Sequence, residues 1–413
     1  MDVKLQLGPE NLSPALVRKV VRHGGKDAFR EASEDLKEDV GIEVNAKQVQ
    51  RITERVGEEW VGARDEAVEL FKQGKLPRLY SQTPAVGVAM MDGGRVLIRA
   101  AEEAPGPHAP EWKEPKYGCC LSLDTKQSNT DPQPEPPSKF LNPERVAKIV
   151  KEIKSRCAKS SDPAPQRTAT SGPRQSRKKK RLRRKETHVL IRTVVATMFS
   201  AEEFGYILAT EVYLRNLDLA KRKGYVCDGQ ACNWTVWEQH FRALGFVPIL
   251  DFLHLLTYLY SAAQAAGGGA KPQWARYEVW LRWAWTGERE KVWAALHAAA
   301  AKAGVPPKDA GEQDPRRILA DAARYVENNI TRMDYPRYRK LGLPFSSAPI
   351  ESVVKQFNRR IKGTEKFWVK SGVEAVLQVR AAYLSQDGRA ERLWGRPRPH
   401  YRAVGRNRLA LAA

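Results

Sequence analysis

Three acidic residues stand where their carboxylates could share metal ions. Asp92 closes an alternating apolar stretch (PAVGVAMMDGG), Asp228 closes a second short one (GYVCDGQ), and Glu351 falls in the first turn of an expected helix (SSAPIESVVKQFNRRIKG). Carboxylates at two strand ends and one helix start can converge on a pair of Mg²⁺ ions, because Mg²⁺ prefers oxygen ligands. Two such ions about 4 Å apart serve in-line phosphoryl displacement. We expect Asp92 to bridge them, and Mn²⁺ to substitute for Mg²⁺.

A second acidic site candidate lies in the segment ILDFLHLLTYL, where Asp251 and His254 are three residues apart on one helix face. The pair could position a scissile phosphate or a flipped base, or support the metal ligands. The plainer interpretation is a helix-capping Asp251 beside an ordinary hydrogen-bonded histidine. The two interpretations do not exclude each other.

The overall charge favours a polyanionic partner. The chain has 413 residues, with 70 Lys and Arg against 48 acidic residues and a net charge of +22. Such an excess promotes binding to nucleic acid through counterion release, although ribosomal, membrane-surface and storage proteins share it. No apolar run approaches the roughly 18 residues of a membrane span, and the first residues lack a signal core. Five cysteines without a CxxC pair indicate reduced thiols and a cytoplasmic location, and the spacing of Cys227 and Cys232 disfavours a zinc site.

Residues 1–80 are expected to form a helical DNA-binding region. Ser13 and Pro14 mark a helix start, a second helix ends at Gly41, and Asn45 can cap a third. Two helices joined by a short glycine-containing turn are typical of a helix-turn-helix. An ordinary helical pair with a solvated polar face is the alternative. In the DNA-binding case the third helix would offer Lys47, Gln48, Gln50 and Arg51.

The alternation from residue 84 onward predicts an α/β core. Residues 84–124 would supply its first part: the strand ending at Asp92, a hairpin partner (RVLIRA) and a third strand at 116–124. Residues 187–251 would supply the second part, opening on a segment (THVLIRTVVATM) that periodicity leaves open between strand and helix. A Ser200-capped helix, a strand ending at Asp228, a helix and a last strand follow. Pro248 indicates that this last strand lies at a sheet edge.

That order of elements suits a ribonuclease-H-like catalytic core interrupted by an all-α insertion. In such a core the first and fourth strands lie side by side, so Asp92 and Asp228 would be neighbours. The insertion would be residues 252–340, whose five tryptophans favour an internal core over base stacking. Residues 341–385 would hold the Glu351 helix and the end of the core. The basic flank of that helix, expected to face DNA phosphates, comprises Arg359, Arg360 and Lys362.

Two further segments are basic. Residues 125–186 are poor in apolar side chains, so we expect a largely disordered linker interrupted by a short helix at 143–157. Residues 386–413 form a basic tail. The linker ends in a candidate phosphate clamp, whose alternative is a solvated tail, formed by Arg177, Lys178, Lys179, Lys180, Arg181, Arg183, Arg184 and Lys185.

Across roughly residues 30–385 the chain resembles transposases of ISKra-type bacterial insertion sequences, which are related to the Mutator-like superfamily. The motifs that carry the resemblance are MDGGRVLIR, WKEPKYGCCLSLD, RTVVATMFSAEEFGYILATEVYLR, YVCDGQACNW, ILDFLHLLTYL and YRKLGLPFSSAPIESVVKQFNRRIKGTEKFW. The segment before the glutamate departs from the family, because SSAPIES stands where a glycine is usual. The short N-terminal region is a second departure.

The resemblance implies a DNA transposase with an Asp-Asp-Glu triad at Asp92, Asp228 and Glu351, and an Asp-x-x-His motif at Asp251 and His254. It implies two-metal hydrolysis at transposon ends, then strand transfer to target DNA. Double-stranded DNA would be the partner, bound by a homodimer or larger assembly. Trp368 matches a family tryptophan that we expect to help position DNA. The alternatives are a repurposed, inactive DNA-binding protein and a ribonuclease-H-type nuclease acting on RNA–DNA hybrids.

Overall fold

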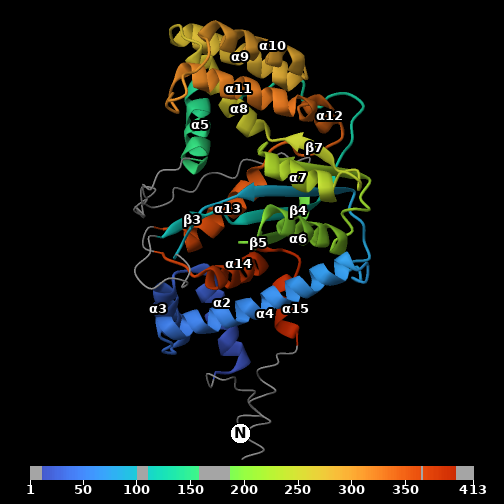
Figure 1. The fold of residues 1–413 in the computed structure, drawn as a ribbon. Helices are drawn as coiled ribbons and strands as arrows, with labels where there is room; N and C mark the ends of the chain where they lie inside the picture. The colour runs from blue at the N-terminus through green and yellow to red at the C-terminus, as the bar shows by residue number, and fades with distance from the viewer. Residues whose placement is uncertain (1–11, 100–109, 158–186, 364–365, 397–413) are drawn as a thin grey trace, which may run out of the picture.

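The computed structural model describes residues 12–99, 110–157, 187–363 and 366–396. Its centre is a five-stranded mixed sheet in the order β5-β4-β1-β6-β7, flanked by helices (Figure 1). The central strand β1 is antiparallel to β4 and parallel to β6, and β5 and β7 form the two edges. The strands are β1 (Val86–Gly93), β4 (Lys116–Thr125), β5 (Thr187–Thr197), β6 (Arg222–Cys227) and β7 (Val247–Leu250).

The parallel pairing of β1 with β6 brings two predicted site residues to one end of the sheet. The last registered pair is Met90 with Val226, and each strand reaches its aspartate two residues later. The prediction that the strands ending at Asp92 and Asp228 are neighbours is therefore confirmed. The edge position of β7, expected from Pro248, is also confirmed.

The predicted hairpin between β1 and the RVLIRA segment is wrong. That segment forms β2 (Val96–Ile98), which pairs with β3 (Glu111–Lys113) in a separate two-stranded sheet. The reason is that β4 and β6 already occupy both sides of β1. The strand that completes the antiparallel half of the main sheet is β5, for which the sequence left strand and helix open.

Helices cover both faces of the sheet. Gly118 of β4 packs against Phe204 and Leu208 of α6 (Ala201–Leu214), whereas the adjacent Tyr117 stacks on Phe357 of α13 (Ala348–Ile361). Since successive strand residues point to opposite faces, α6 and α13 lie on opposite faces of the sheet. The helix α7 (Ala231–His240) connects β6 to β7.

The N-terminal helices begin and end as their sequence predicts. Ser13 and Asn45 cap α2 and α4, and Gly41 ends α3 in the left-handed conformation at φ 68°. The three helices do not stand apart, because their apolar faces pack on α14 and on Trp394 of α15 (Figure 1). Their bounds are α2 (Pro14–Lys26), α3 (Phe29–Val40), α4 (Ala46–Lys72), α14 (Lys370–Leu384) and α15 (Arg389–Gly395).

Residues 252–340 form an all-α unit, here called the helical lobe, at the β7 end of the sheet (Figure 1). Trp280 and Trp285 are buried in it and Trp293 is 38% exposed, so most of its tryptophan surface serves packing, as expected. Its elements are α8 (Phe252–Ala265), α9 (Ala270–Thr286), α10 (Arg289–Ala303), α11 (Pro315–Asn329), the 3₁₀ turn η2 (Ile330–Arg332) and α12 (Tyr335–Lys340).

The expectation of disorder is wrong for residues 126–142, which include η1 (Ser138–Phe140) and are fastened to the helical lobe. The short helix expected at 143–157 is confirmed as α5 (Pro143–Cys157). Arg339 donates two hydrogen bonds to Asp131, of 2.8 and 2.5 Å, and Trp285 donates one of 2.9 Å to the Gln133 carbonyl. The basic run at 177–185 lies outside the described residues. Within those residues, no helix has the length and apolar character needed to cross a membrane.

Candidate functional site

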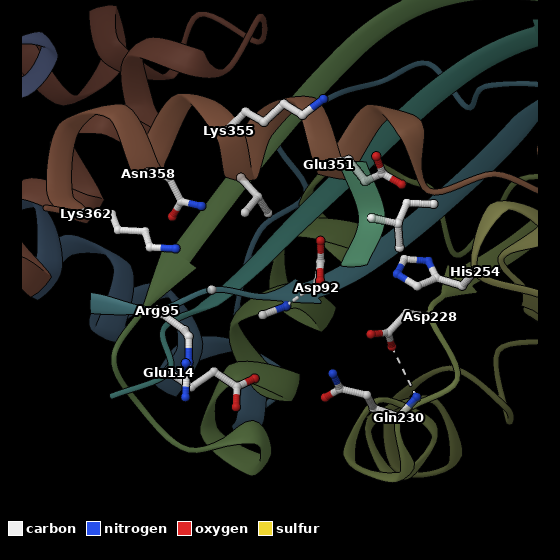
Figure 2. A pocket seen from close by; sticks show the side chains of 14 residues that line it. Asp92, Arg95, Glu114, Asp228, Gln230, His254, Glu351, Lys355, Asn358 and Lys362 are labelled. Atoms are coloured by element: carbon white, nitrogen blue, oxygen red, sulfur yellow. Dashed lines mark hydrogen bonds between the residues drawn. The ribbon is translucent and has the colours of Figure 1, made fainter. Parts of the chain in front are cut away.

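The three predicted carboxylates line one cavity of about 340 Å³ at the end of the sheet (Figure 2). Asp92 reaches it from β1, Asp228 from the turn after β6, and Glu351 from the first turn of α13. His254 of α8 lines the same cavity and lies between Asp228 and Glu351 in the close view. Residues from distant parts of the sequence therefore converge here, as their spacing predicts.

Local turns hold the two aspartates. One Asp92 carboxylate oxygen accepts a 2.8 Å hydrogen bond from the Gly93 backbone N–H. One Asp228 carboxylate oxygen accepts bonds from the Gln230 backbone N–H, at 3.1 Å, and from the Asn233 side-chain amide, at 2.8 Å. The contacts of Asp228 form at the start of α7, where a carboxylate interacts favourably with the helix N-terminus.

Asp251 joins the cavity to the start of α13. It caps α8 by accepting the backbone N–H groups of Leu253 and His254, both at 3.2 Å, and it lies 2.5 Å from His254 Nδ1. Ser347 donates its backbone N–H to the same carboxylate at 3.0 Å. The helix-capping interpretation is therefore confirmed. Since His254 also lines the cavity, the pair is in place to support the site as well.

Ser347 is a site residue that the sequence did not reveal. Its hydroxyl lies 2.8 Å from Asp251 Oδ2 and 3.0 Å from Glu351 Oε1, so it connects the two acidic residues. One ligand atom each of Asp251, His254 and Glu351 lie within 4.8 Å of one another. Such a trio has the spacing of a metal site or of the partners that orient metal ligands.

The electrostatics of the cavity favour a bound cation. Burial, together with the Asp228 carboxylate, raises the pKa of Asp92 to about 7. Burial also raises the pKa of Asp228, although His254 opposes the rise. For Asp251 burial acts in the same direction, but bonds from His254 and Ser347 outweigh it and the pKa lies below its ordinary value. A divalent ion would stabilise the ionised forms of Asp92 and Asp228.

Basic side chains border the acidic cavity. Lys355 and the polar Asn358 line it from α13, Lys362 lines it from the position just after α13, and Arg95 lines it from the segment after β1 (Figure 2). Of these, only Lys362 was predicted. Lys355 lies four residues after Glu351, which is the helical spacing that keeps both on one face, so a signal was present. Cations beside the carboxylates suit a phosphate-bearing substrate.

Two predicted DNA contacts are wrong. Arg360 is 2% exposed, donates a 2.9 Å hydrogen bond to the Gly24 carbonyl, and lies over the rings of Phe29 and Trp368. Burial lowers its pKa to about 10. Trp368 is 6% exposed and donates to the Ile361 carbonyl. Both side chains pack the N-terminal helices against α13 and face away from solvent. Arg359, in contrast, is exposed.

Helix α4, which was predicted to contact DNA, offers fewer free side chains than expected. Lys47 and Arg51 are exposed on α4. Gln48 forms a capping box with Asn45, with bonds of 3.2 and 2.9 Å, and Gln50 donates to Glu54. Lys47 and Arg51 are therefore the side chains of this set that remain available to a partner.

Within the described residues, free thiols with no disulfide are found at Cys119, Cys120, Cys227 and Cys232.

No protein-family model matches this sequence, and no curated protein matches it. The chemistry available at the cavity is that of four carboxylates (Asp92, Glu114, Asp228 and Glu351), a histidine and bordering cations. Such a set can hold divalent ions and a phosphodiester together.

Proposed function

We propose that this chain is a DNA transposase that uses Asp92, Asp228 and Glu351 as its catalytic triad. The observation that carries the proposal is the convergence of these three residues, each from its expected element, on one cavity bordered by basic side chains. The family resemblance of the motifs points to the same three positions. Its further implication, an Asp-x-x-His motif at Asp251 and His254, agrees with their position beside Glu351.

The sheet supports a ribonuclease-H-like core. Counting only strands of the main sheet, the chain forms them in the order β1, β4, β5, β6, β7, and the first strand lies at the centre beside the fourth. Three antiparallel strands followed by two parallel ones are the arrangement expected for that core. The helical lobe enters between β7 and α13, which is where the resemblance implies an insertion.

Asp92, Asp228 and Glu351 would hold two Mg²⁺ ions, with Mn²⁺ as a substitute. When bound, the ions supply charge that activates the attacking oxygen and stabilises the leaving oxygen of the phosphodiester. The protein's own part is to fix the carboxylates before substrate arrives. Gly93, Asn233 and Ser347 do this through the bonds described above, so little reorganisation is left for the reaction.

Double-stranded DNA is the proposed partner, as transposon end and as target. Lys355, Lys362 and Arg95 border the cavity where the scissile phosphate would lie, and Arg359, Lys47 and Arg51 are exposed cations beyond it. We propose a homodimer or larger assembly on DNA, because each active site handles one end at a time. The protein would act on DNA in the cytoplasm of a bacterium.

The test is cleavage of a labelled DNA duplex in the presence of Mg²⁺ or Mn²⁺. The duplex carries one end of the insertion sequence that surrounds the gene for this protein. Asp228→Ala should abolish cutting and leave DNA binding nearly intact. Asp124→Ala is the matched control, because Asp124 is an exposed aspartate of β4. Binding without cutting by the unmodified chain would instead support a repurposed DNA-binding protein. Preferential cutting of RNA–DNA hybrids would support a general ribonuclease-H-type nuclease.

A further inference from the structure

The helical lobe is fastened to the edge of the sheet by tyrosine hydroxyls. Strand β7 pairs with β6 on one side only. Two of its carbonyls accept hydrogen bonds from the lobe: Pro248 from the Tyr338 hydroxyl at 3.1 Å, and Leu250 from the Tyr335 hydroxyl at 3.2 Å. Edge-strand carbonyls require a partner when they are covered. The lobe thus takes the place of a further strand, and its position relative to the sheet is fixed.

A third tyrosine of the lobe reaches the candidate active site. The Tyr325 hydroxyl of α11 donates a 2.8 Å hydrogen bond to the main-chain carbonyl of Asp228. Its ring stacks on Tyr258 of α8, with centroids 3.8 Å apart and planes 16° from parallel. The stack restricts the ring, so the hydroxyl has a defined direction.

Asn329 reinforces the same junction. It is 1% exposed, and its side-chain amide donates to the Tyr325 carbonyl at 2.9 Å. Its side-chain oxygen accepts a 2.8 Å bond from the indole N–H of Trp234, a residue of α7. Helix α11 is therefore tied to the helix that follows Asp228 as well as to Asp228 itself.

The turn after Asp228 is shaped for this contact. Gly229 has φ +93°, a conformation that L side chains rarely adopt, and a Cβ there would lie 2.9 Å from the Tyr325 ring. The Asp228 carboxylate is held from one side by Gln230 and Asn233. Its main-chain carbonyl is held by Tyr325, so both the side chain and the main chain of this residue are held.

We propose that Tyr325 is a positioning residue of the catalytic cavity, through which the helical lobe holds Asp228 in its metal-binding position. The inference rests on the proposed function, because it assigns a role to Asp228 as a metal ligand. The lobe then belongs to the active site, although it supplies no carboxylate of the triad. Loss of the Tyr325 hydroxyl removes its hydrogen bond to the Asp228 main chain and, with it, part of what directs the carboxylate.

The test compares Tyr325→Phe with Tyr277→Phe in the full chain. Tyr277 is a matched control because its hydroxyl also donates a bond from the lobe to a main-chain carbonyl, that of Phe140 in η1, at 3.1 Å. Mn²⁺ binding is measured by calorimetry without DNA, beside the melting temperature and the cleavage rate. Tyr325→Phe should weaken Mn²⁺ affinity by about tenfold, as loss of a partner that orients a ligand does. Both variants should melt alike.

Equal Mn²⁺ affinity in the two variants would overturn the inference while leaving the proposed function intact. The same holds if Tyr325→Phe loses affinity only in step with its melting temperature. Absence of both Mn²⁺ binding and cleavage in the unmodified chain would instead refute the proposed function and, with it, the inference. The two failures are therefore distinguishable in one set of measurements.

Discussion

Replacing Asp92 by Asn should stabilise the metal-free protein, most strongly at alkaline pH. The pKa of Asp92 is raised from 3.8 to about 7 by burial and by the Asp228 carboxylate. The folded protein therefore binds this proton more tightly than the unfolded chain does. The free energy of unfolding falls as the pH rises from about 4 to about 7, and is constant above that range. Asn carries no proton to lose, so the variant escapes this fall.

The magnitude follows from the pKa difference. Each pKa unit corresponds to about 1.4 kcal/mol, so a rise of three units costs about 4 kcal/mol once Asp92 is fully ionised. Between pH 5 and pH 8 only the part from pH 5 to about 7 is traversed. The stability advantage of Asp92→Asn should therefore grow by about 3 kcal/mol over that interval.

Urea denaturation in the presence of a chelator measures this effect at pH 5 and pH 8. Asp124→Asn, at the exposed aspartate of β4, is the control and should show no comparable change between the two pH values. Added Mn²⁺ should reverse the order at pH 8, because the unmodified site gains ligand binding and the variant does not. An Asp92→Asn advantage that is equal at both pH values, or larger at pH 5, would refute this account of the cavity.

Other perturbations separate catalytic, structural and DNA-binding roles. Ser347→Ala breaks the connection between Asp251 and Glu351, so cleavage should fall by about 10- to 100-fold with DNA binding unchanged in a gel-shift assay; an unchanged rate contradicts the connection. Arg360→Ala should lower the free energy of unfolding by about 2–4 kcal/mol, measured in urea, because the side chain is buried and hydrogen-bonded. Its neighbour Arg359→Ala should leave stability within about 0.5 kcal/mol. If Arg359 contacts DNA, that variant should bind less tightly and reduce the salt dependence by about one counterion, whereas an unchanged salt slope removes it from the interface.

Local rules explain what could be predicted from the sequence. The caps at Ser13, Asn45 and Ser200 depend on a few adjacent residues, and each side chain accepts the expected backbone N–H. The neighbouring positions of Asp92 and Asp228 required only strand ends and an expected order of elements. The expected order of elements thus predicted that the two aspartates lie at one end of the sheet.

Nonlocal contacts explain the misses. The partner of β2 depends on which strands already flank β1, and nothing within the hairpin motif reports that. Ser347 gains its role from Asp251, which belongs to another element. Arg360 is different, because it lies three residues after Phe357 and beside Ile361, on the apolar stripe of α13. The burial of Arg360 could therefore have been predicted from helical spacing, but its charge suggested a position on the surface.

One helix near the end of the described chain completes the apolar core that the first helices begin. Val379 and Ala382 of α14 pack in the same cluster as residues of α2, α3 and α4, and a Cβ on Gly57 would collide with the Ala375 carbonyl. During synthesis, the N-terminal helices therefore cannot bury the part of their apolar faces that α14 covers until α14 has left the ribosome. A polypeptide chain that ends before residue 370 would leave that part of the helices' apolar surface exposed, and proteases and chaperones recognise such surface. Premature termination should consequently leave no stable N-terminal fragment to compete with the full-length chain.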